Sequence, residues 1–487
     1  MFWLTIFSLL QIHPIHALWP QPTHLDSGDQ VLWLDPALQV HLHCRDPQSV
    51  TLEYPTEFKT SGYLQIVQDG IQLTRGLWDR VRFRSKGRRD GLNHDSLTES
   101  AMLQAAVRET IESIHESRFV PWKFHKRHRK FEPDTGEPRH YVSSLEIVQQ
   151  QCPREEGFAP SYFFGGDESY ELFIEPVTAR IQANSTIGVL RALETLKQLF
   201  YAHSSASGSY IPNAPLHIVD RPKWSHRGLS LDIARNPFYP EDVLRTIDVM
   251  ATTKFSRLHV HATDSQSWPL DIPSLPGLAE KGAYHPGLVW TTADLEKIQR
   301  YGARKGVSVF VEIDMPGHTA AIAYSRPDLI AAFNELDWSH FAAEPLSGQL
   351  KLNSSAVLEF VDILLQDLLP RVGQHTTLYH AGGDEVNRHA YLLDETVRTD
   401  DPRILQPLLQ NLFDRIIDRV IEHGLQPVVW EEMILDWNLS LPSAAASRFP
   451  ADTLVQVWRN SERIQEVVER GYRVLFGDYH YWYLDCK

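Results

Sequence analysis

The sequence predicts an α/β protein: a (β/α)8-type barrel that lacks its last strand-helix unit, preceded by a small α+β domain. Two observations predict this fold class. From about residue 220 onward, short apolar strands recur, and each is followed by a segment long enough for a helix, which is typical of parallel sheets. The 487 residues also exceed what one ordinary core accommodates, so we expect at least two domains.

Residues 1–17 predict a signal peptide. They combine an apolar run with a small residue at Ala17, although no positive charge precedes the run. A buried N-terminal strand or helix is the alternative. Sequons of the Asn-x-Ser/Thr type suit a secreted, extracellular glycoprotein, and no later stretch reaches the roughly 18 apolar residues that span a bilayer. The sequons begin at Asn184, Asn353 and Asn438.

Residues 18–219 predict the α+β domain. Helices are expected at 96–117 and 186–203, because apolar residues recur there with helical spacing after helix-start residues. Strands are expected where apolar and polar residues alternate, at 31–44, 140–150 and 170–183. We recognise no catalytic constellation in this part of the sequence.

Residues 220–487 predict the barrel. Right-handed crossovers between successive strand-helix units would place the strands parallel in one sheet. A doubly wound open sheet is the alternative, because seven strands do not by themselves close a barrel. The expected strands are 226–235, 257–264, 307–316, 377–385, 426–432, 453–458 and 473–479. We see no eighth strand before Lys487.

Composition and motifs restrict the classes of molecule that the protein is expected to bind. The formal net charge of -15 argues against nucleic acid and anionic membrane surfaces. The 13 Trp residues suit sugar binding, because an indole ring covers the apolar face of a pyranose, although most Trp residues fill cores. His259 and His261 could suggest a metal site, but no matching ligands follow on later strands. We therefore expect these histidines to pack or form hydrogen bonds, with no metal and no cofactor.

Polar residues and tryptophans gather at the C-terminal ends of the expected barrel strands. In a (β/α) barrel, the loops at this rim build the active site. One polar strand end is ordinary, because strands exit into solvent, whereas six ends that converge on one mouth predict a site. The candidates are Arg235, Asp264, His318, Asp384, Glu385, Trp430 and Trp458.

The segment HAGGDEVN (380–387) is the most specific of these strand ends. Two glycines let the backbone pass close to a ligand, and Asp384 and Glu385 follow directly. Paired carboxylates suggest a glycosidase, but adjacent residues cannot easily flank a sugar from opposite faces. If Glu385 is the acid, the nucleophile must come from elsewhere, and the 2-acetamido oxygen of the substrate is one candidate. An exposed Asp-Glu pair on a loop is the alternative.

Six segments, taken in order, resemble the β-N-acetylhexosaminidases of glycoside hydrolase family 20, especially the secreted fungal enzymes. They are HRGLSLDIARNPF, HVHATDSQSWP, EIDMPGHT, HAGGDEVN, VVWEE and YWYLDC, within residues 226–486. The first half is similar to the small zincin-like α/β domain of that family. The resemblance implies an exo-acting hydrolase that releases terminal non-reducing β-linked GlcNAc or GalNAc, as in chitin degradation, by a substrate-assisted retaining mechanism.

The resemblance also implies residue roles. Glu385 matches the general acid/base, and Asp384 matches the carboxylate that orients the acetamido N–H and stabilises an oxazolinium intermediate. Tyr483 matches the hydroxyl donor to the acetamido carbonyl. The other matches are Trp430 and Trp458 as pocket walls, Arg235 and Asp485 as binders of sugar hydroxyls, and Asp264 with His318 as a pair that tunes the pKa of Glu385. As alternatives, the tryptophans could belong to the core, and Arg235 could pair with Asp232.

The chain departs from the family pattern at its C-terminal end. It stops just after YWYLDC, whereas family members continue through an eighth strand that supplies another pocket tryptophan and a glutamate. Of the three cysteines, Cys44, Cys152 and Cys486, the last matches one that pairs further on in the fungal relatives. The alternative function is therefore an inactive truncated paralogue or fragment that binds sugar. The expected partner is an N-acetylhexosamine-containing oligosaccharide or glycan. A homodimer is a further possible assembly.

Overall fold

The computed structural model describes residues 18–44, 52–54, 97–122, 125–444 and 452–484. The predicted signal peptide, Asp485 and Cys486 lie outside the described residues. The chain divides into two compact units, Met1–Phe158 with Asp167–Arg221 and Ala159–Gly166 with Pro222–Lys487. No described helix is long and apolar enough to cross a membrane.

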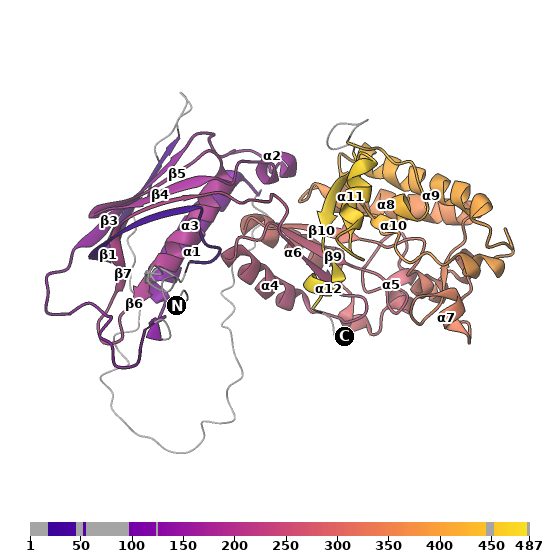
Figure 1. The fold of residues 1–487 in the computed structure, drawn as a ribbon, viewed down its shortest axis with the longest axis horizontal. Coiled ribbons are helices and arrows are strands. Elements are labelled where there is room, and N and C mark those ends of the chain that lie inside the picture. Colours follow the sequence, from indigo (N-terminus) through magenta and orange to yellow (C-terminus); the bar gives the residue numbers. More distant parts are fainter. Residues whose placement is uncertain (1–17, 45–51, 55–96, 123–124, 445–451, 485–487) are drawn as a thin grey trace, which may run out of the picture. The chain divides into compact units, whose positions relative to one another are not determined.

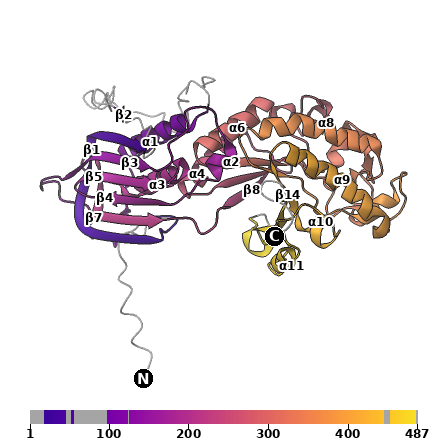
Figure 2. The same ribbon diagram turned by 90° about the horizontal axis from the view of Figure 1, so that it is seen from above.

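The first unit contains a seven-stranded sheet with the order β2-β1-β3-β5-β4-β7-β6 (Figure 1). The strands are β1 (His24–Cys44), β2 (Leu52–Tyr54), β3 (Tyr141–Gln149), β4 (Tyr170–Ile174), β5 (Val177–Ala183), β6 (Tyr201–Ala202) and β7 (Ser209–Asp220). The long strand β1 pairs parallel with β3 and antiparallel with β2 and β7. Figure 2 shows the strands of this sheet side by side.

Two helices, α1 (Glu99–Glu116) and α3 (Thr186–Leu199), lie side by side against this sheet. Each begins after a hydroxyl residue, Thr98 or Ser185, whose side chain accepts a backbone N–H of the first turn. Such a cap satisfies one of the N–H groups that have no partner within the helix. Both helices predicted for this part of the chain are confirmed.

The strand prediction at 170–183 is wrong in one respect. The segment forms two antiparallel strands, β4 and β5, instead of one. Pro176 has no N–H to donate to a ladder, and Val177 has a φ of 81°, so the chain reverses between the two strands. The strand predicted at 140–150 is confirmed as β3, and the one at 31–44 forms the later part of β1.

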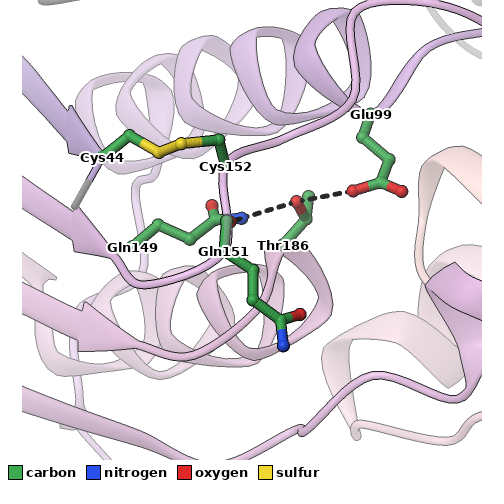
Figure 3. Close-up of a disulfide and its surroundings, with 6 residues drawn as sticks. All are labelled: Cys44, Glu99, Gln149, Gln151, Cys152 and Thr186. Atoms are coloured by element: carbon green, nitrogen blue, oxygen red, sulfur yellow. Dashed lines mark hydrogen bonds between the residues drawn. A yellow bond between two sulfur atoms is a disulfide. The ribbon is translucent and has the colours of Figure 1, made fainter. Parts of the chain in front are cut away.

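A disulfide joins Cys44, at the end of β1, to Cys152, just beyond β3, with Cα atoms 5.4 Å apart (Figure 3). Beside it, Gln149 Nε2 donates to Thr186 Oγ1 over 2.9 Å. The same hydroxyl donates to Glu99 Oε2 over 3.1 Å. Because Thr186 and Glu99 lie at the starts of α3 and α1, these contacts hold both helices to the end of β3.

The second unit contains α2 (Pro160–Phe164) and a curled parallel sheet of seven strands, in the order β16-β15-β14-β13-β10-β9-β8. The strands are β8 (Gly228–Asp232), β9 (Arg257–His261), β10 (Ser308–Glu312), β13 (Leu378–His380), β14 (Gln426–Trp430), β15 (Leu454–Val457) and β16 (Arg473–Phe476). All seven predicted barrel strands are confirmed. Their order follows the chain without the reversal of a doubly wound sheet, so that alternative is wrong.

Helices follow most of these strands. They are α4 (Pro240–Thr252), α5 (Gly277–Gly282), α6 (Thr292–Arg304), α7 (Trp338–Phe341), α8 (Ser355–Val372), α9 (Pro402–Glu422), α10 (Glu431–Leu435), α11 (Arg463–Glu469) and α12 (Tyr479–Trp482). Short 3-10 helices occur at η2 (Pro286–Leu288), η3 (Ala320–Tyr324), η4 (Pro327–Leu329) and η5 (Arg388–Leu392), and β11 (Ile330–Ala331) pairs with β12 (Gln349–Leu350).

The period of two along each strand sorts the side chains of the parallel sheet. Leu258 and Val309 belong to the large core that the helices cover, whereas Phe310 and Val428 belong to a small cluster on the other face. The middle strands β10 and β14 are wholly buried, and the edge strands β8 and β16 are half-exposed. Among the described residues, no ladder joins these two edges.

Candidate active site

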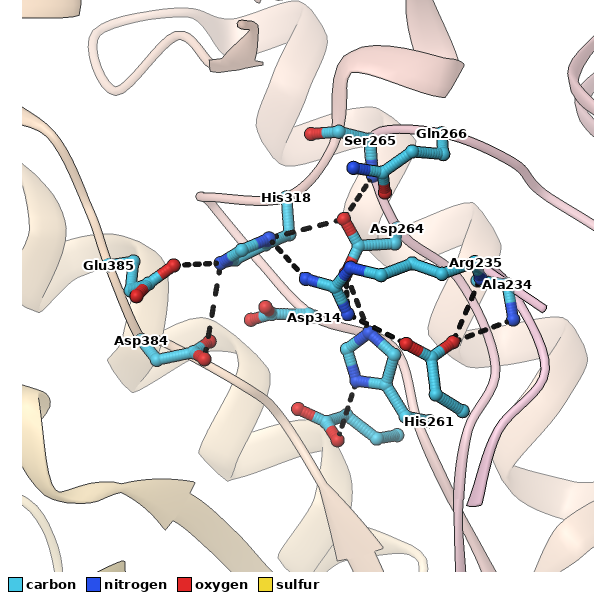
Figure 4. A network of polar contacts seen from close by, with 12 residues as sticks. Ala234, Arg235, His261, Asp264, Ser265, Gln266, Asp314, His318, Asp384 and Glu385 are labelled. Carbon is cyan, nitrogen blue, oxygen red and sulfur yellow. Dashed lines mark hydrogen bonds and ion pairs between the residues drawn. The ribbon is translucent and has the colours of Figure 1, made fainter. Parts of the chain in front are cut away.

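Five of the predicted residues meet at the C-terminal rim of the parallel sheet: Arg235, Asp264, His318, Asp384 and Glu385 (Figure 4). They follow β8, β9, β10 and β13, and parallel strands end at the same edge. His318 is the centre of the group. Its Nδ1 lies 3.1 Å from Asp264 Oδ1, and its Nε2 lies 3.2 Å from Glu385 Oε2. Asp384 Oδ2 lies 3.9 Å from the same Nε2.

Arg235 contacts three carboxylates. Its Nη1 lies 2.8 Å from Asp232 Oδ2 and 2.9 Å from Asp264 Oδ2, and its Nη2 pairs with Glu344. The pairing with Asp232 that the sequence left as an alternative is therefore formed, together with a contact into the site. Burial lowers the pKa of Arg235, but the charges of Asp264 and Asp232 outweigh burial and raise it.

The backbone before the two adjacent carboxylates needs its glycines. Gly382 and Gly383 have φ of 69° and 102°, in the left-handed region. A Cβ at Gly382 would lie 1.8 Å from Asp314 Oδ1, and the Gly383 N–H donates to that oxygen over 2.7 Å. The glycines thus let Asp314 lie directly beneath the segment. Glu385 has a φ of 50°, an uncommon conformation that is found often at functional sites.

Asp314 and Asp384 form a buried pair of carboxyl groups. Asp314 is fully buried, and its Oδ2 and Asp384 Oδ1 accept no hydrogen bond from any N–H or hydroxyl among the described residues. Burial and the charge of Asp384 raise the pKa of Asp314 well above its usual value. Burial also raises the pKa of Asp384, but His318 and the hydrogen bond from Asp314 oppose that effect, so Asp314 is the donor of the pair and Asp384 the acceptor.

His318 and Asp264 form a buried ion pair. Burial lowers the pKa of His318, but the carboxylates of Asp264 and Asp384 outweigh burial and raise it well above its usual value. Burial raises the pKa of Asp264, but His318 and His261 outweigh burial and hold it well below its usual range. His318 is therefore an imidazolium whose two N–H groups point at Asp264 and Glu385.

The two adjacent carboxylates differ in access to solvent. The side chain of Glu385 is 31% exposed and that of Asp384 is 18% exposed. Glu385 can therefore reach a group of an incoming molecule, while Asp384 stays in the floor beside it. Both spring from one short stretch of backbone, so neither side chain opposes the other across a sugar ring.

The two predicted tryptophans lie in different settings. Trp430 is buried, with 7% exposure, and its indole N–H donates to Glu312 Oε1 over 2.7 Å. Trp458 is half-buried, and its N–H donates to Glu432 Oε1 over 3.0 Å. Burial and the charge of Asp384 raise the pKa of Glu432 to about 8. Glu432 thus connects Trp458 to the carboxylates, whereas Trp430 fits the core alternative as well as a pocket wall.

Tyr483 follows α12 and stacks on Trp458, with ring centroids 6.3 Å apart and planes 24° apart. Its side chain is 40% exposed. Tyr483 is therefore placed with one of the predicted wall residues. Asp485 lies outside the described residues, so its role stays a prediction.

Sequence reasoning missed three carboxylates of the site. Asp314 and Glu432 follow the ends of β10 and β14, and the strand-end signal could have found both. Glu344 lies in the loop after α7 and pairs with Arg235, and the sequence pattern gives no signal for it. It approaches the rim only because of the tertiary fold.

Donor sets that could hold a metal ion occur in this unit, such as His259, Glu312 and His380, or Asp314, His318 and Asp384. Part of each set is engaged in other contacts. His380 Nδ1 accepts the Gly382 N–H over 3.0 Å, and both nitrogens of His318 face carboxylates. We assign no metal to either set.

Comparison with known families and proteins gives consistent matches. Residues 224–487 match the model of the glycosyl hydrolase family 20 catalytic domain, and residues 18–199 match a model described as beta-acetyl hexosaminidase like. A beta-hexosaminidase of Arthroderma benhamiae is 43% identical over 100% of this chain and 78% of its own length. A chitooligosaccharidolytic beta-N-acetylglucosaminidase of Bombyx mori is 31% identical over 66% of this chain and 56% of its own length.

Solved structures share the fold. The chitobiase of Flavobacterium johnsoniae has a TM-score of 0.66 at 20% identity, over 95% of this chain and 59% of that one. The exo beta-N-acetylglucosaminidase of Vibrio harveyi has a TM-score of 0.65 at 18% identity, over 95% of this chain and 60% of that one. The chain thus spans only part of the length of these proteins. The family model and the relative from Arthroderma benhamiae together show that the chain belongs to glycosyl hydrolase family 20.

Proposed function

We propose that this protein is an exo-acting β-N-acetylhexosaminidase that hydrolyses terminal non-reducing β-linked GlcNAc or GalNAc in an oligosaccharide or glycan. The observation that carries the proposal is the cluster at the rim. Glu385 is accessible, Asp384 lies beside it in the floor, and the His318 imidazolium faces both. The names of the relatives, which include a beta-hexosaminidase and a beta-N-acetylglucosaminidase, support the same substrate class.

In the first step, the acetamido oxygen of the substrate attacks C1 while the glycosidic C1–O bond breaks. Glu385 gives its proton to the departing oxygen, and Asp384 accepts the acetamido N–H and stabilises the oxazolinium charge. Asp384 suits this role because the charge of His318 and a hydrogen bond from Asp314 both favour its carboxylate form against the effect of burial. A carboxylate nucleophile on the opposite face is not required.

In the second step, the Glu385 carboxylate takes a proton from a water molecule as the water attacks C1. The C1–O bond of the oxazolinium ring breaks and restores the acetamido group. Two displacements at C1 give retention of configuration. The His318 N–H that points at Glu385 stabilises the carboxylate between the two steps.

The remaining predicted residues complete the proposed pocket. Trp458 and Tyr483 would flank the acetamido group, with the Tyr483 hydroxyl donating to its carbonyl, and their stacking supports a shared place. Arg235 and Asp485 would bind sugar hydroxyls. Three carboxylates around Arg235 hold its guanidinium in a fixed orientation.

Secretion and the incomplete barrel belong to the proposal as well. The Cys44–Cys152 disulfide supports a secreted protein, because disulfides persist in oxidising compartments. The half-exposed edge strands β8 and β16 support an eighth strand-helix unit that would lie between them in a complete barrel. They also keep open a second function, sugar binding without turnover.

The test is hydrolysis of 4-nitrophenyl N-acetyl-β-D-glucosaminide by the full chain, with the Glu385→Gln variant beside it. We expect turnover by the parent chain and a loss of about 10²–10⁴-fold in kcat in the variant, because the amide cannot donate the proton. A parent chain that binds GlcNAc in a titration but does not hydrolyse the substrate would support the second function. A Glu385→Gln variant as fast as the parent would refute the assignment of the acid.

A further inference from the structure

A second histidine beneath the site repeats the arrangement around His318. His261 Nε2 lies 2.8 Å from Asp264 Oδ2 (Figure 4). The other ring nitrogen, Nδ1, lies 2.9 Å from Glu312 Oε2. Asp264 also contacts His318, and His318 contacts Glu385. Carboxylates and imidazoles therefore alternate in one row of side chains that runs from Glu312 to the proposed acid, Glu385.

The register of the strands brings the first members of this row together. His261 ends β9 and pairs with Glu312 at the end of β10, and Glu312 pairs in turn with His380 at the end of β13. Residues in register on neighbouring parallel strands point to the same face. The three side chains therefore converge on the face of the sheet that also carries Phe310, below the loops that carry Asp264 and His318.

The contacts determine the protonation of His261. A neutral imidazole has one N–H and one lone pair, and here the lone pair would face a carboxylate oxygen at hydrogen-bond distance. Protonation of both nitrogens removes this repulsion, with Nε2 in a hydrogen bond to Asp264 and Nδ1 in an ion pair with Glu312, so the geometry favours an imidazolium. Burial lowers the pKa of His261, but Glu312 and Asp264 outweigh burial and raise it well above its usual value. His380 differs, because its Nδ1 accepts the Gly382 N–H and burial lowers its pKa to about 3.

Glu312 is arranged to stay ionised. Its side chain is fully buried, and it accepts the Trp430 indole N–H over 2.7 Å. His259 Nε2 lies 2.7 Å from Oε2, the oxygen that also faces His261. A buried carboxylate persists only where donors or cations surround it, and these three rings provide them.

We propose that His261, held as an imidazolium by Glu312, is a positioning residue for Glu385 that acts through Asp264 and His318. The proposal rests on the proposed function. The His261 cation offsets part of the charge of Asp264, as Arg235 does on the same oxygen. Asp264 can then orient the His318 ring without drawing its proton away, and the opposite N–H stays directed at Glu385. The charged and titratable groups that face the two rings include Glu312, Asp264, Arg235, Glu344, Asp314, Asp384 and Glu385.

The variants Glu312→Gln and Glu312→Ala separate charge from shape. Gln keeps the volume and can donate to His261 Nδ1, so the ring loses its charge but retains the hydrogen bond to Asp264. We expect a loss of about tenfold to 100-fold in kcat on 4-nitrophenyl N-acetyl-β-D-glucosaminide, with KM within about twofold of the parent. Glu241→Gln, an exposed carboxylate of the same unit, is the matched control. A Glu312→Gln variant with parental kcat beside an impaired Glu312→Ala variant would leave Glu312 only a packing role and overturn the proposal.

Nitrogen NMR of the ¹⁵N-histidine-labelled full chain reads the charges without any activity, with signals assigned by His261→Gln and His318→Gln. At pH 7 we expect both nitrogens of His261 to be protonated, and we expect Glu312→Gln to neutralise the ring and shift the His318 signals. His375, whose pKa burial lowers to about 4, is the neutral reference. A neutral His261 in the parent, or unchanged His318 signals in Glu312→Gln, would overturn the proposal. An inactive parent with the expected NMR result would reject the proposed function and retain the coupling of His261 to His318.

Discussion

The pair of buried aspartates, Asp314 and Asp384, contributes to the charge of the proposed site. Burial raises the pKa of Asp384, and two neighbours oppose that effect: the His318 cation and a hydrogen bond from Asp314, which burial and the charge of Asp384 keep protonated. The usual ionisation of two aspartates would place two negative charges side by side in a buried place. The protein avoids this cost by keeping one of the two neutral.

An amide can therefore replace Asp314. In Asp314→Asn the amide oxygen can still accept the Gly383 N–H and the NH₂ group can still donate to Asp384, so we expect kcat within about threefold of the parent. Asp384→Asn removes the charge itself and should cost about 10²-fold or more in kcat. Steady-state kinetics of the two variants checks this. An equal loss in both would mean that Asp314 is ionised in the working protein.

Glu432 makes stability depend on pH. Burial and the charge of Asp384 raise its pKa from 4.5 to about 8, so the unfolded chain releases this proton at lower pH than the folded chain does. The contribution of Glu432 is fully present below pH 4.5 and is lost as the pH rises toward 8. Glu432→Gln keeps the acceptor for the Trp458 indole N–H and removes the titration.

We therefore expect Glu432→Gln to unfold at a higher denaturant concentration than the parent at pH 8 and at a similar one at pH 4. Denaturant midpoints of the barrel unit at several pH values measure this. A variant whose midpoint follows the parent at every pH would show that Glu432 is already ionised in the folded protein.

The sequence could predict His318 and the four residues around it, because each follows a strand whose apolar run is readable. It could not predict the charges. Whether Asp314 is protonated depends on how closely Asp384 approaches it, and that distance is a property of the fold. Glu344 could not be found for a related reason, since its loop has no periodic pattern and only its tertiary position brings it to Arg235.

At the scale of elements, the turn after β13 positions the site. It needs both a left-handed backbone and space, because Asp314 lies against Gly382. Gly424 offers a matched comparison. Its φ of 72° is close to the 69° of Gly382, but a Cβ there would meet nothing within 4 Å.

We expect Gly424→Ala to cost about 1–2 kcal/mol, the strain of a left-handed alanine. Gly382→Ala should cost about 1–3 kcal/mol more, because its Cβ must displace Asp314, and it should also reduce activity. Thermal and urea unfolding of both variants measures the difference. Equal losses of stability would show that the space beneath Gly382 is not needed.

Helices and strands agree with the sequence-based expectation where the apolar residues keep one spacing over a long segment. The seven barrel strands and the two helices of the first unit are confirmed because their apolar residues keep one period. The hairpin of β4 and β5 was read as one strand, because alternation continues across Pro176 while the chain reverses. The single proline and the positive φ after it outweigh the pattern.

At the scale of the whole molecule, strand order was predictable because the units follow one another along the chain. The alternation of strands and helices along the sequence does not decide what lies between β8 and β16. An eighth strand-helix unit at that place stays a proposal. The series of contacts from Glu312 to Glu385 involves residues on or just after three neighbouring strands. It exists only once β9, β10 and β13 pair, so a sequence pattern within one strand could not reveal it.

The most direct test of the central claim varies the acyl group of the substrate and leaves the leaving group unchanged. In a series of 4-nitrophenyl glucosaminides with N-acetyl, N-fluoroacetyl and N-trifluoroacetyl groups, fluorine makes the acyl oxygen a weaker nucleophile. If that oxygen attacks C1, kcat of the full chain falls steeply with each fluorine substitution, by about tenfold or more across the series. A kcat that does not change along the series would contradict substrate assistance at Asp384 and Glu385.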